Sequence, residues 1–254
     1  MESLFRYPTA VLLVTLAAQW LAAFLGHVLR KRVAPSREEE KADFNTILGA
    51  TLTLLALIIG FSFSMAIDRY DQRVNLEEAE ANAIGDEYVR VDLLPLADAA
   101  RTRSLLASYT QARIQFYRER DPRRIASIAA ATAKLQGDLW TSVTGPANAH
   151  QTPTTALAAA GMTDVLNAQG YTQAAWRNHI PAGAWALMLL IAAAGNFLLG
   201  ASQQRRAPAL LIILPLIVSA PLFLIADTDS PRQGLIRIEP ANLVALANSL
   251  PPPH

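Results

Sequence analysis

The chain has 254 residues, of which 52% are hydrophobic and 17% charged, with a formal net charge of +1. This composition is too apolar for an ordinary soluble domain and too charged for a chain that lies wholly in lipid. The small net charge and the scattered basic residues exclude a strong electrostatic field for nucleic acid. Because there is no cysteine, disulfides and thiolate chemistry are also excluded.

Four windows approach or exceed the roughly 20 apolar residues that cross a hydrocarbon core of about 30 Å. They are residues 8–29, 46–67, 181–201 and 208–226, and His27 is the only ionisable side chain in them. The first window is longer than the roughly 7–15 residues of a signal-peptide core, so we interpret it as an uncleaved helix. Because the spans lack the carboxylates that proton relays use, active transport is disfavoured.

The sequence predicts an all-α integral membrane protein with four transmembrane helices. Residues 1–67 hold the first two spans, 68–180 a soluble helical module, 181–226 the last two spans and 227–254 a C-terminal tail. The module shows no strand-like alternation. Asp121-Pro122 fits an N-cap and first helical turn, whereas Gly145-Pro146 fits the end of a helix. A last helix over residues 152–179 leads back to the membrane.

Residues 44–94 contain no proline, so we predict that the second span continues into water as one long stalk helix. Steps of alternately three and four residues from Thr46 give one stripe that is small or hydroxylated inside the membrane and apolar outside it. Small residues let helices approach closely in lipid, and an apolar seam of period 3.5 joins helices in water. We therefore predict a helix-packing face, within the subunit or between subunits, that contains Gly49, Ala56, Gly60, Ile67, Tyr70 and Val74.

Two other interpretations of this helix stay open. The Ser and Thr residues of the stripe could instead face water in a pore. A second stripe advances by fours through Thr53, Leu57 and Phe61, and by periodicity alone it indicates contact with lipid or core.

No motif in the chain predicts an enzyme, a cofactor or a metal site. The acidic residues Glu77, Glu78, Glu80, Asp86 and Glu87 favour a solvated, partly paired helix face. Asp227-Thr228-Asp229 fails the calcium-loop pattern, since Pro231 stands at its fifth position, and capping or anchoring is favoured. Asn196 is the most polar residue predicted deep in the membrane, and we expect an interhelical hydrogen bond there. Pro215 and Pro221 predict kinks in the fourth span.

Three segments carry a resemblance to a known family: LLALIIGFSFSMAIDRYDQR, the EANAIG that follows it, and DTDSPRQGLIRI at residues 227–238. Together with the order of two spans, helical module and two spans, they resemble the bacterial bestrophin-like membrane proteins. The second span is also similar to that of true bestrophins, in which an LGF-type turn precedes a basic residue and aromatics. Ile59-Gly60-Phe61 and Arg69-Tyr70 match that pattern here.

The resemblance implies a homo-oligomeric passive ion channel, pentameric as in bestrophins, for chloride or other small anions in the bacterial inner membrane. It places Thr53, Leu57 and Phe61 in a narrow hydrophobic neck formed by the second span. The chain departs from the family pattern in lacking the acidic run that binds calcium in animal bestrophins. The alternative hypothesis is a non-conducting membrane scaffold or sensor whose helical module binds a partner.

Basic residues predict the orientation in the bilayer. The two short loops between spans contain Arg30, Lys31, Arg32, Arg37, Lys41, Arg205 and Arg206. Under the positive-inside rule these loops lie in the cytoplasm, which places the termini and the helical module outside it. The resemblance implies the opposite side, because bestrophins keep their soluble module in the cytoplasm.

Overall fold

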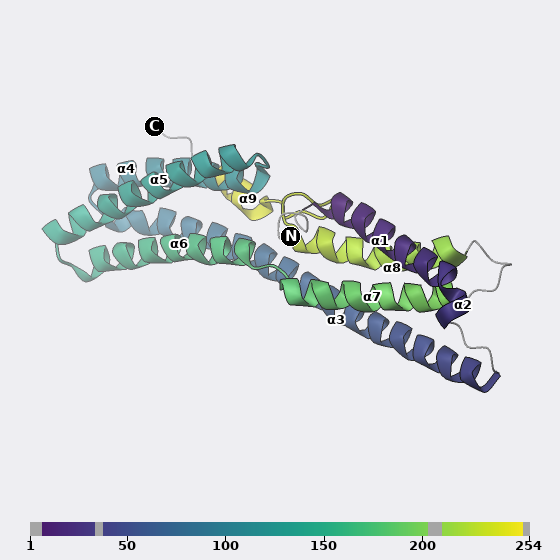
Figure 1. The fold of residues 1–254 in the computed structure, drawn as a ribbon. Coiled ribbons are helices and arrows are strands. Elements are labelled where there is room, and N and C mark those ends of the chain that lie inside the picture. Colours follow the sequence, from purple (N-terminus) through teal and green to yellow (C-terminus); the bar gives the residue numbers. More distant parts are fainter. Residues whose placement is uncertain (1–6, 34–37, 203–209, 251–254) are drawn as a thin grey trace. The chain divides into compact units, whose positions relative to one another are not determined.

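The computed structural model describes residues 7–33, 38–202 and 210–250, and every regular element in these ranges is helical. The predicted start of the fourth span at residue 208, and Arg6, Arg37, Arg205 and Arg206, lie outside them. The elements are α1 (Pro8–Val28), α2 (Arg30–Val33), α3 (Glu38–Arg90), η1 (Val91–Leu93), α4 (Leu96–Arg118), α5 (Pro122–Ala149), α6 (Pro153–Arg177), α7 (Ala182–Ser202), α8 (Leu210–Asp229) and α9 (Ala241–Ser249) (Figure 1). The predicted all-α class is confirmed.

Among the described residues, four helices are long and apolar enough to cross a membrane. They are α1, the first part of α3, α7 and α8, so the four predicted spans are confirmed. The second span also continues without a break into the predicted stalk, since α3 runs for 53 residues. The chain is therefore an integral membrane protein.

The chain divides into two compact units. The membrane unit combines the described residues up to Arg69 with His179–Arg237, and the helical unit combines Tyr70–Asn178 with the described residues from Ile238 onward. Helix α3 contributes its first part to the membrane unit and its second part to the helical unit.

In the membrane unit, α1 packs along both α7 and α8. Its contact with α7 is close because glycines meet backbone there: a Cβ on Gly26 would collide with the carbonyl oxygen of Phe197, and one on Gly200 with that of Ala23. Beside these glycines Asn196 donates a hydrogen bond of 2.9 Å to Gln19, which confirms the interhelical bond predicted for Asn196. Small residues and a buried amide pair thus join two spans in the way expected in lipid.

In the helical unit, α4 and α6 pack against α5, and α9 packs against α4. The Asp121 carboxylate accepts a hydrogen bond from the Arg123 backbone, which confirms the predicted N-cap of α5. The predicted stop at Gly145-Pro146 is wrong, because α5 continues to Ala149. A proline in the last turn removes only one helical hydrogen bond, and the ring of Pro146 is buried in the packed unit.

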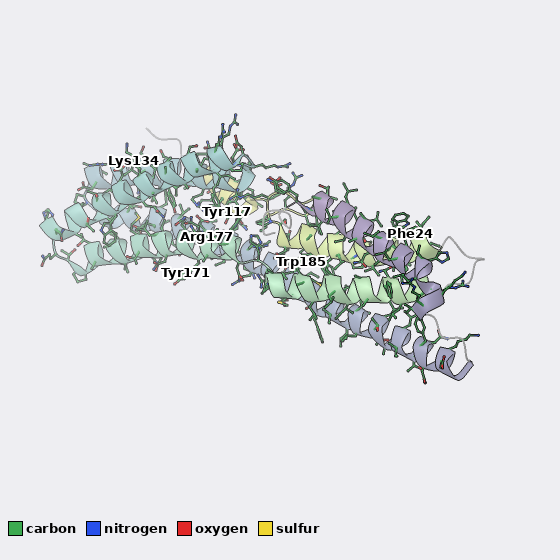
Figure 2. All side chains as sticks on the ribbon, in the orientation of Figure 1. Phe24, Tyr117, Lys134, Tyr171, Arg177 and Trp185 are labelled. Carbon is green, nitrogen blue, oxygen red and sulfur yellow. The ribbon has the colours of Figure 1, made fainter. Side chains whose placement is uncertain are left out.

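Aromatic side chains fill the centre of the helical unit. The rings of Phe116 and Tyr117 on α4 each lie 5.2 Å from that of Trp176 on α6. Figure 2 labels Tyr117 in this core, and it also labels Lys134 and Tyr171, which are exposed on α5 and α6. Rings and aliphatic side chains together hold α4 and α6 in one core.

Candidate functional site

One side of the membrane part of α3 packs against other helices of the membrane unit. Leu55, Ser62 and Ala66 are at most 3% exposed, and their spacing of seven and four residues places them on one helix face. Leu52 and Thr51 lie against Gly195 of α7 on the same side. This face anchors α3 to the rest of the membrane unit.

The opposite side of the same segment carries the predicted neck residues. Thr53 is exposed, and Leu57 and Phe61 are 53% and 65% exposed. These three side chains project away from the membrane unit rather than into its core.

The membrane part of the predicted packing face shares that outward side. Gly49, Ala56 and Gly60 are exposed, and a Cβ on either glycine would have no atom within 4 Å. Ile67 is also exposed, at 39%. Among the residues of the predicted packing face, only Tyr70 and Val74, which belong to the helical unit, pack against the core of that unit. The structure therefore brings the two stripes together on one surface, which we call the outward face of α3.

The outward face has a distinctive chemistry for a membrane surface. From residue 46 to 67 it combines small, hydroxylated and large apolar side chains, with no charged group. Such a surface can contact lipid, a second protein helix or a narrow pore, since none of these requires charge compensation.

The half of α3 that belongs to the helical unit has buried charged side chains, so the predicted solvated acidic face is wrong in part. Glu77, Glu80 and Glu87, predicted to lie on a solvated face, are at most 1% exposed, as is Arg73. Glu78 and Asp86 are exposed, as predicted. Steps of four and three residues also connect these buried side chains with Ile84 and Val91, which form one heptad row. The row that contains Tyr70 and Val74 lies beside this buried row and is more apolar, so apolar patterning alone does not identify the charged row.

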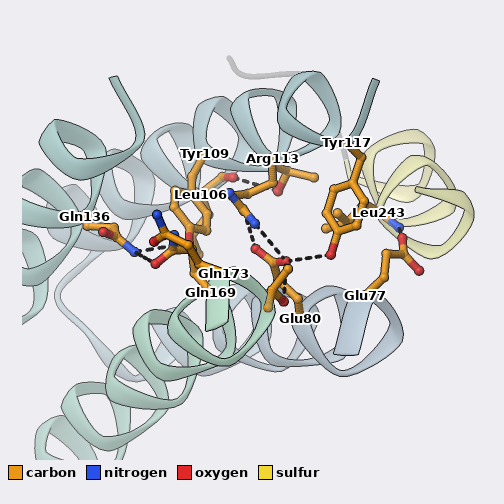
Figure 3. Close-up of polar contacts among 12 residues, drawn as sticks. Glu77, Glu80, Leu106, Tyr109, Arg113, Tyr117, Gln136, Gln169, Gln173 and Leu243 are labelled. Carbon is orange, nitrogen blue, oxygen red and sulfur yellow. Dashed lines mark hydrogen bonds and ion pairs between the residues drawn. The ribbon is translucent and has the colours of Figure 1, made fainter. Parts of the chain in front are cut away.

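Glu80 is the centre of a buried network between α3, α4 and α6 (Figure 3). Arg113 donates to both carboxylate oxygens, while the hydroxyls of Tyr117 and Thr172 each donate at 3.2 Å. Burial opposes the charge on Arg113, but the neighbouring Glu80 outweighs it and raises the pKa of the guanidinium. Burial, reinforced by Glu80, also raises the pKa of Tyr117. The network therefore holds one compensated ion pair inside the unit.

Two further buried groups on α3 bind backbone at the ends of other elements. The Glu77 carboxylate accepts hydrogen bonds from the Leu243 backbone at 2.9 Å and the Asn242 side chain at 2.7 Å. Arg73 donates to the carbonyl oxygens of Ala175 and Asn178, at the end of α6. Glu77 thereby holds the first turn of α9, a helix that sequence analysis did not predict.

The aspartates in the last turn of α8 bind backbone amides, in agreement with the predicted capping or anchoring role. Asp227 accepts hydrogen bonds from the amides of Leu235 and Ile236, at 2.7 and 2.9 Å. Asp229 accepts one from the amide of Ile180 at 3.0 Å. Within the described residues, no group of three or more acidic or histidine side chains could hold a metal ion.

Comparisons with known proteins are consistent with these observations. The sequence model described as Bestrophin-like domain matches residues 17–243. No curated protein matches the chain. A crystal structure of a bacterial bestrophin homolog from Klebsiella pneumoniae matches with a TM-score of 0.62 at 16% identity, over 95% of this chain and 98% of that one. A point mutant of that homolog matches with a TM-score of 0.64 at 14% identity, over 94% and 97% of the two chains. At these identities the structural matches show a shared fold.

Proposed function

This chain belongs to the bestrophin-like family, and from that membership we propose that it forms a homo-oligomeric passive anion channel in the bacterial inner membrane. The pore lies on the oligomer axis and is lined by the outward face of α3. Chloride and other small anions are the proposed permeant ions. The family comparison supports channel activity rather than an enzymatic function.

The observation that carries this proposal is the outward face itself. Four uncharged spans of one subunit enclose little space, so a conducting path has to form between copies. The outward face is uncharged, and Leu57 and Phe61 are more than half exposed on it. A rigid helix with one side anchored in its own unit and the other free to line an axis is suited to such a path.

The same residues suggest how conduction is controlled. When copies of Leu57 and Phe61 surround an axis, they form a hydrophobic constriction that conducts only when it is wetted. Thr53 supplies a hydroxyl on the same stripe, which can donate a hydrogen bond to a partly dehydrated anion. The narrow, apolar constriction at Leu57 and Phe61 would set the energy barrier to ion passage. Hydroxyl dipoles such as that of Thr53 would contribute to ion selectivity.

Anion flux into liposomes tests the proposal. Purified oligomer is reconstituted, and chloride flux is compared among the unsubstituted chain, Leu57→Ala and Phe61→Ala. We expect both variants to increase flux, because a smaller side chain lowers the barrier to wetting. Leu190→Ala is the matched control, since Leu190 on α7 is 68% exposed but lies on another span.

The contrary outcome is equally specific. If a well-folded oligomer shows no flux and the neck variants are silent, the channel proposal is wrong, and the non-conducting scaffold or sensor becomes the better hypothesis. Flux that responds to Leu190→Ala as strongly as to Phe61→Ala would instead remove the neck from the proposal.

We propose, from loop charge, that the helical unit lies outside the cytoplasm. The chain has no cysteine, so a single cysteine at Lys134 can be labelled specifically. Lys134 is exposed on α5, whereas the nearby Gln136 donates a hydrogen bond to Gln169 and is a poorer choice. Labelling of intact spheroplasts by an impermeant maleimide supports the proposal. Labelling only after lysis places the unit in the cytoplasm, as the bestrophin resemblance implies.

A further inference from the structure

Glu87 differs from the other buried carboxylates of α3. It is 0% exposed, and neither of its carboxylate oxygens has a hydrogen-bond partner among the described residues. Glu77 and Glu80, by contrast, each accept hydrogen bonds from at least two groups. Because a buried carboxylate without a partner is strongly unfavourable, Glu87 is suited to its neutral, protonated form.

Helix α6 approaches this carboxyl group directly. A Cβ on Gly161 would collide with Oε2 of Glu87 and would come too close to Nη1 of Arg90. Because Gly161 has no side chain, the α6 backbone lies directly against the ends of these two side chains. A change in the charge or position of the Glu87 carboxyl group therefore alters the packing of α6 against α3.

The charged groups around Glu87 are few and already engaged. On α3 itself, Arg90 donates to Asp164 of α6 at 3.5 Å, and the two side chains are 33% and 65% exposed. On η1 and α4, Asp92 and Arg103 form a separate ion pair. Arg90 is the cation whose charge lowers the pKa of Glu87, and it is shared with Asp164, whose charge raises that pKa.

We propose that Glu87 is a proton-binding site that couples pH to the packing of α6 on α3. With the proton bound, the neutral carboxyl group lies against Gly161 while Arg90 bonds Asp164. When the proton leaves to water, the new carboxylate competes for Arg90, which then releases Asp164 and loosens the contact with α6. The inference concerns the helical unit and does not depend on ion conduction.

Electrostatics places this event near physiological pH. Burial raises the pKa of Glu87 from 4.5 to about 8, with Arg90 lowering it and Asp164 raising it. Since the folded-state pKa lies above the unfolded one, the folded chain binds more protons between these values. The associated stability is present below pH 4.5 and is lost as pH rises through about 8.

Infrared difference spectroscopy of the purified full-length chain tests the proton site. The carbonyl band of a protonated carboxylic acid is expected at neutral pH, with loss of the band centred near pH 8. Glu87→Gln should abolish this band. Glu78→Gln should retain it, because Glu78 is an exposed carboxylate on the same helix.

Two neighbouring substitutions should move the midpoint in opposite directions. Asp164→Asn removes a negative charge and releases Arg90, so the midpoint shifts to lower pH. Arg90→Gln removes the positive charge, so the midpoint shifts to higher pH. Asp164 is largely exposed, so the first variant tests the charge effect with little risk to folding.

Hydrogen exchange tests the coupling to α6. At each pH, exchange in residues 153–177 is compared between the unsubstituted chain and Glu87→Gln, so that intrinsic pH effects cancel. Exchange in the unsubstituted chain should rise in parallel with loss of the infrared band. A band that survives Glu87→Gln, or a midpoint that neither neighbouring variant moves, would overturn the proton site. Equal exchange in both proteins at all pH values would overturn the coupling.

Discussion

The two halves of α3 both pack against other helices, but one half buries uncharged side chains and the other buries charged ones. In the membrane unit, the residues buried against other helices are uncharged, such as Leu55, Ser62 and Ala66. In the helical unit, the buried row contains Arg73, Glu77, Glu80 and Glu87. The membrane half has no ionisable side chain between residues 46 and 67, whereas the half in the helical unit has several buried ionisable side chains.

This difference shows that burial of charge depends on available partners more than on the surrounding solvent. The helical unit supplies Arg113, hydroxyls and free amides to its carboxylates, so most of them are compensated. The membrane unit instead brings backbones together at Gly26 and Gly200, where close contact replaces ionic interaction.

The largest effect is expected where the ion pair is broken. Arg113→Met leaves Glu80 with only two hydroxyl donors in a buried site. Removing one partner of a buried ion pair costs about 3–5 kcal/mol, so the free energy of unfolding should fall by that amount. Chemical unfolding of the detergent-solubilised chain, followed by tryptophan fluorescence, measures this loss.

Two controls separate charge from volume in that experiment. Arg101→Met, at an exposed position of α4, should leave stability nearly unchanged. The double variant Glu80→Met with Arg113→Met removes both charges and should recover much of the loss. A double variant as unstable as the single one would show that packing, rather than the uncompensated carboxylate, determines the effect.

A smaller loss is expected where backbones meet in the membrane unit. Gly200→Ala forces a methyl group onto the Ala23 carbonyl oxygen, and overpacking of this kind typically costs about 1–3 kcal/mol. Gly60→Ala is the matched control, because the added Cβ would have no atom of another helix within 4 Å. Thermal unfolding in detergent should separate the two variants, and equal stability would contradict the close-contact interpretation. Weaker oligomers of Gly60→Ala in native mass spectrometry would place the outward face between subunits.

Most of the fold followed from simple patterns in the sequence. Uncharged windows predicted the four spans, and the proline-free stretch from 44 to 94 predicted the continuous α3 helix. These features succeed because bilayer thickness and proline geometry act locally. The Asp121 cap was predictable for the same reason, whereas the Asn196 hydrogen bond was predictable because a polar side chain inside a span needs a partner.

The buried charges were not predictable by the rules applied to single residues. An acidic helix face usually is solvated, and only tertiary contacts with Arg113, Thr172 and Leu243 explain why Glu77 and Glu80 are buried. Helix α9 was missed because its burial depends on docking near Glu77 rather than on its own nine residues. For the proposed neck residues, the sequence pattern identifies one helix face, but the neighbour of that face depends on the proposed oligomer.

The smallest effect is expected at the amide pair between α1 and α7. Asn196 donates to Gln19 at 2.9 Å and to the carbonyl oxygen of Ala192, on its own helix, at 3.0 Å. After Gln19→Leu, Asn196 keeps its local bond, so the loss is partial. Membrane hydrogen bonds contribute about 0.6 kcal/mol on average, and a double-mutant cycle with Asn196→Leu should give a coupling near that value. A coupling comparable to that expected for Glu80 and Arg113 would contradict the contrast between the two halves, because polar pairing would then stabilise both units equally.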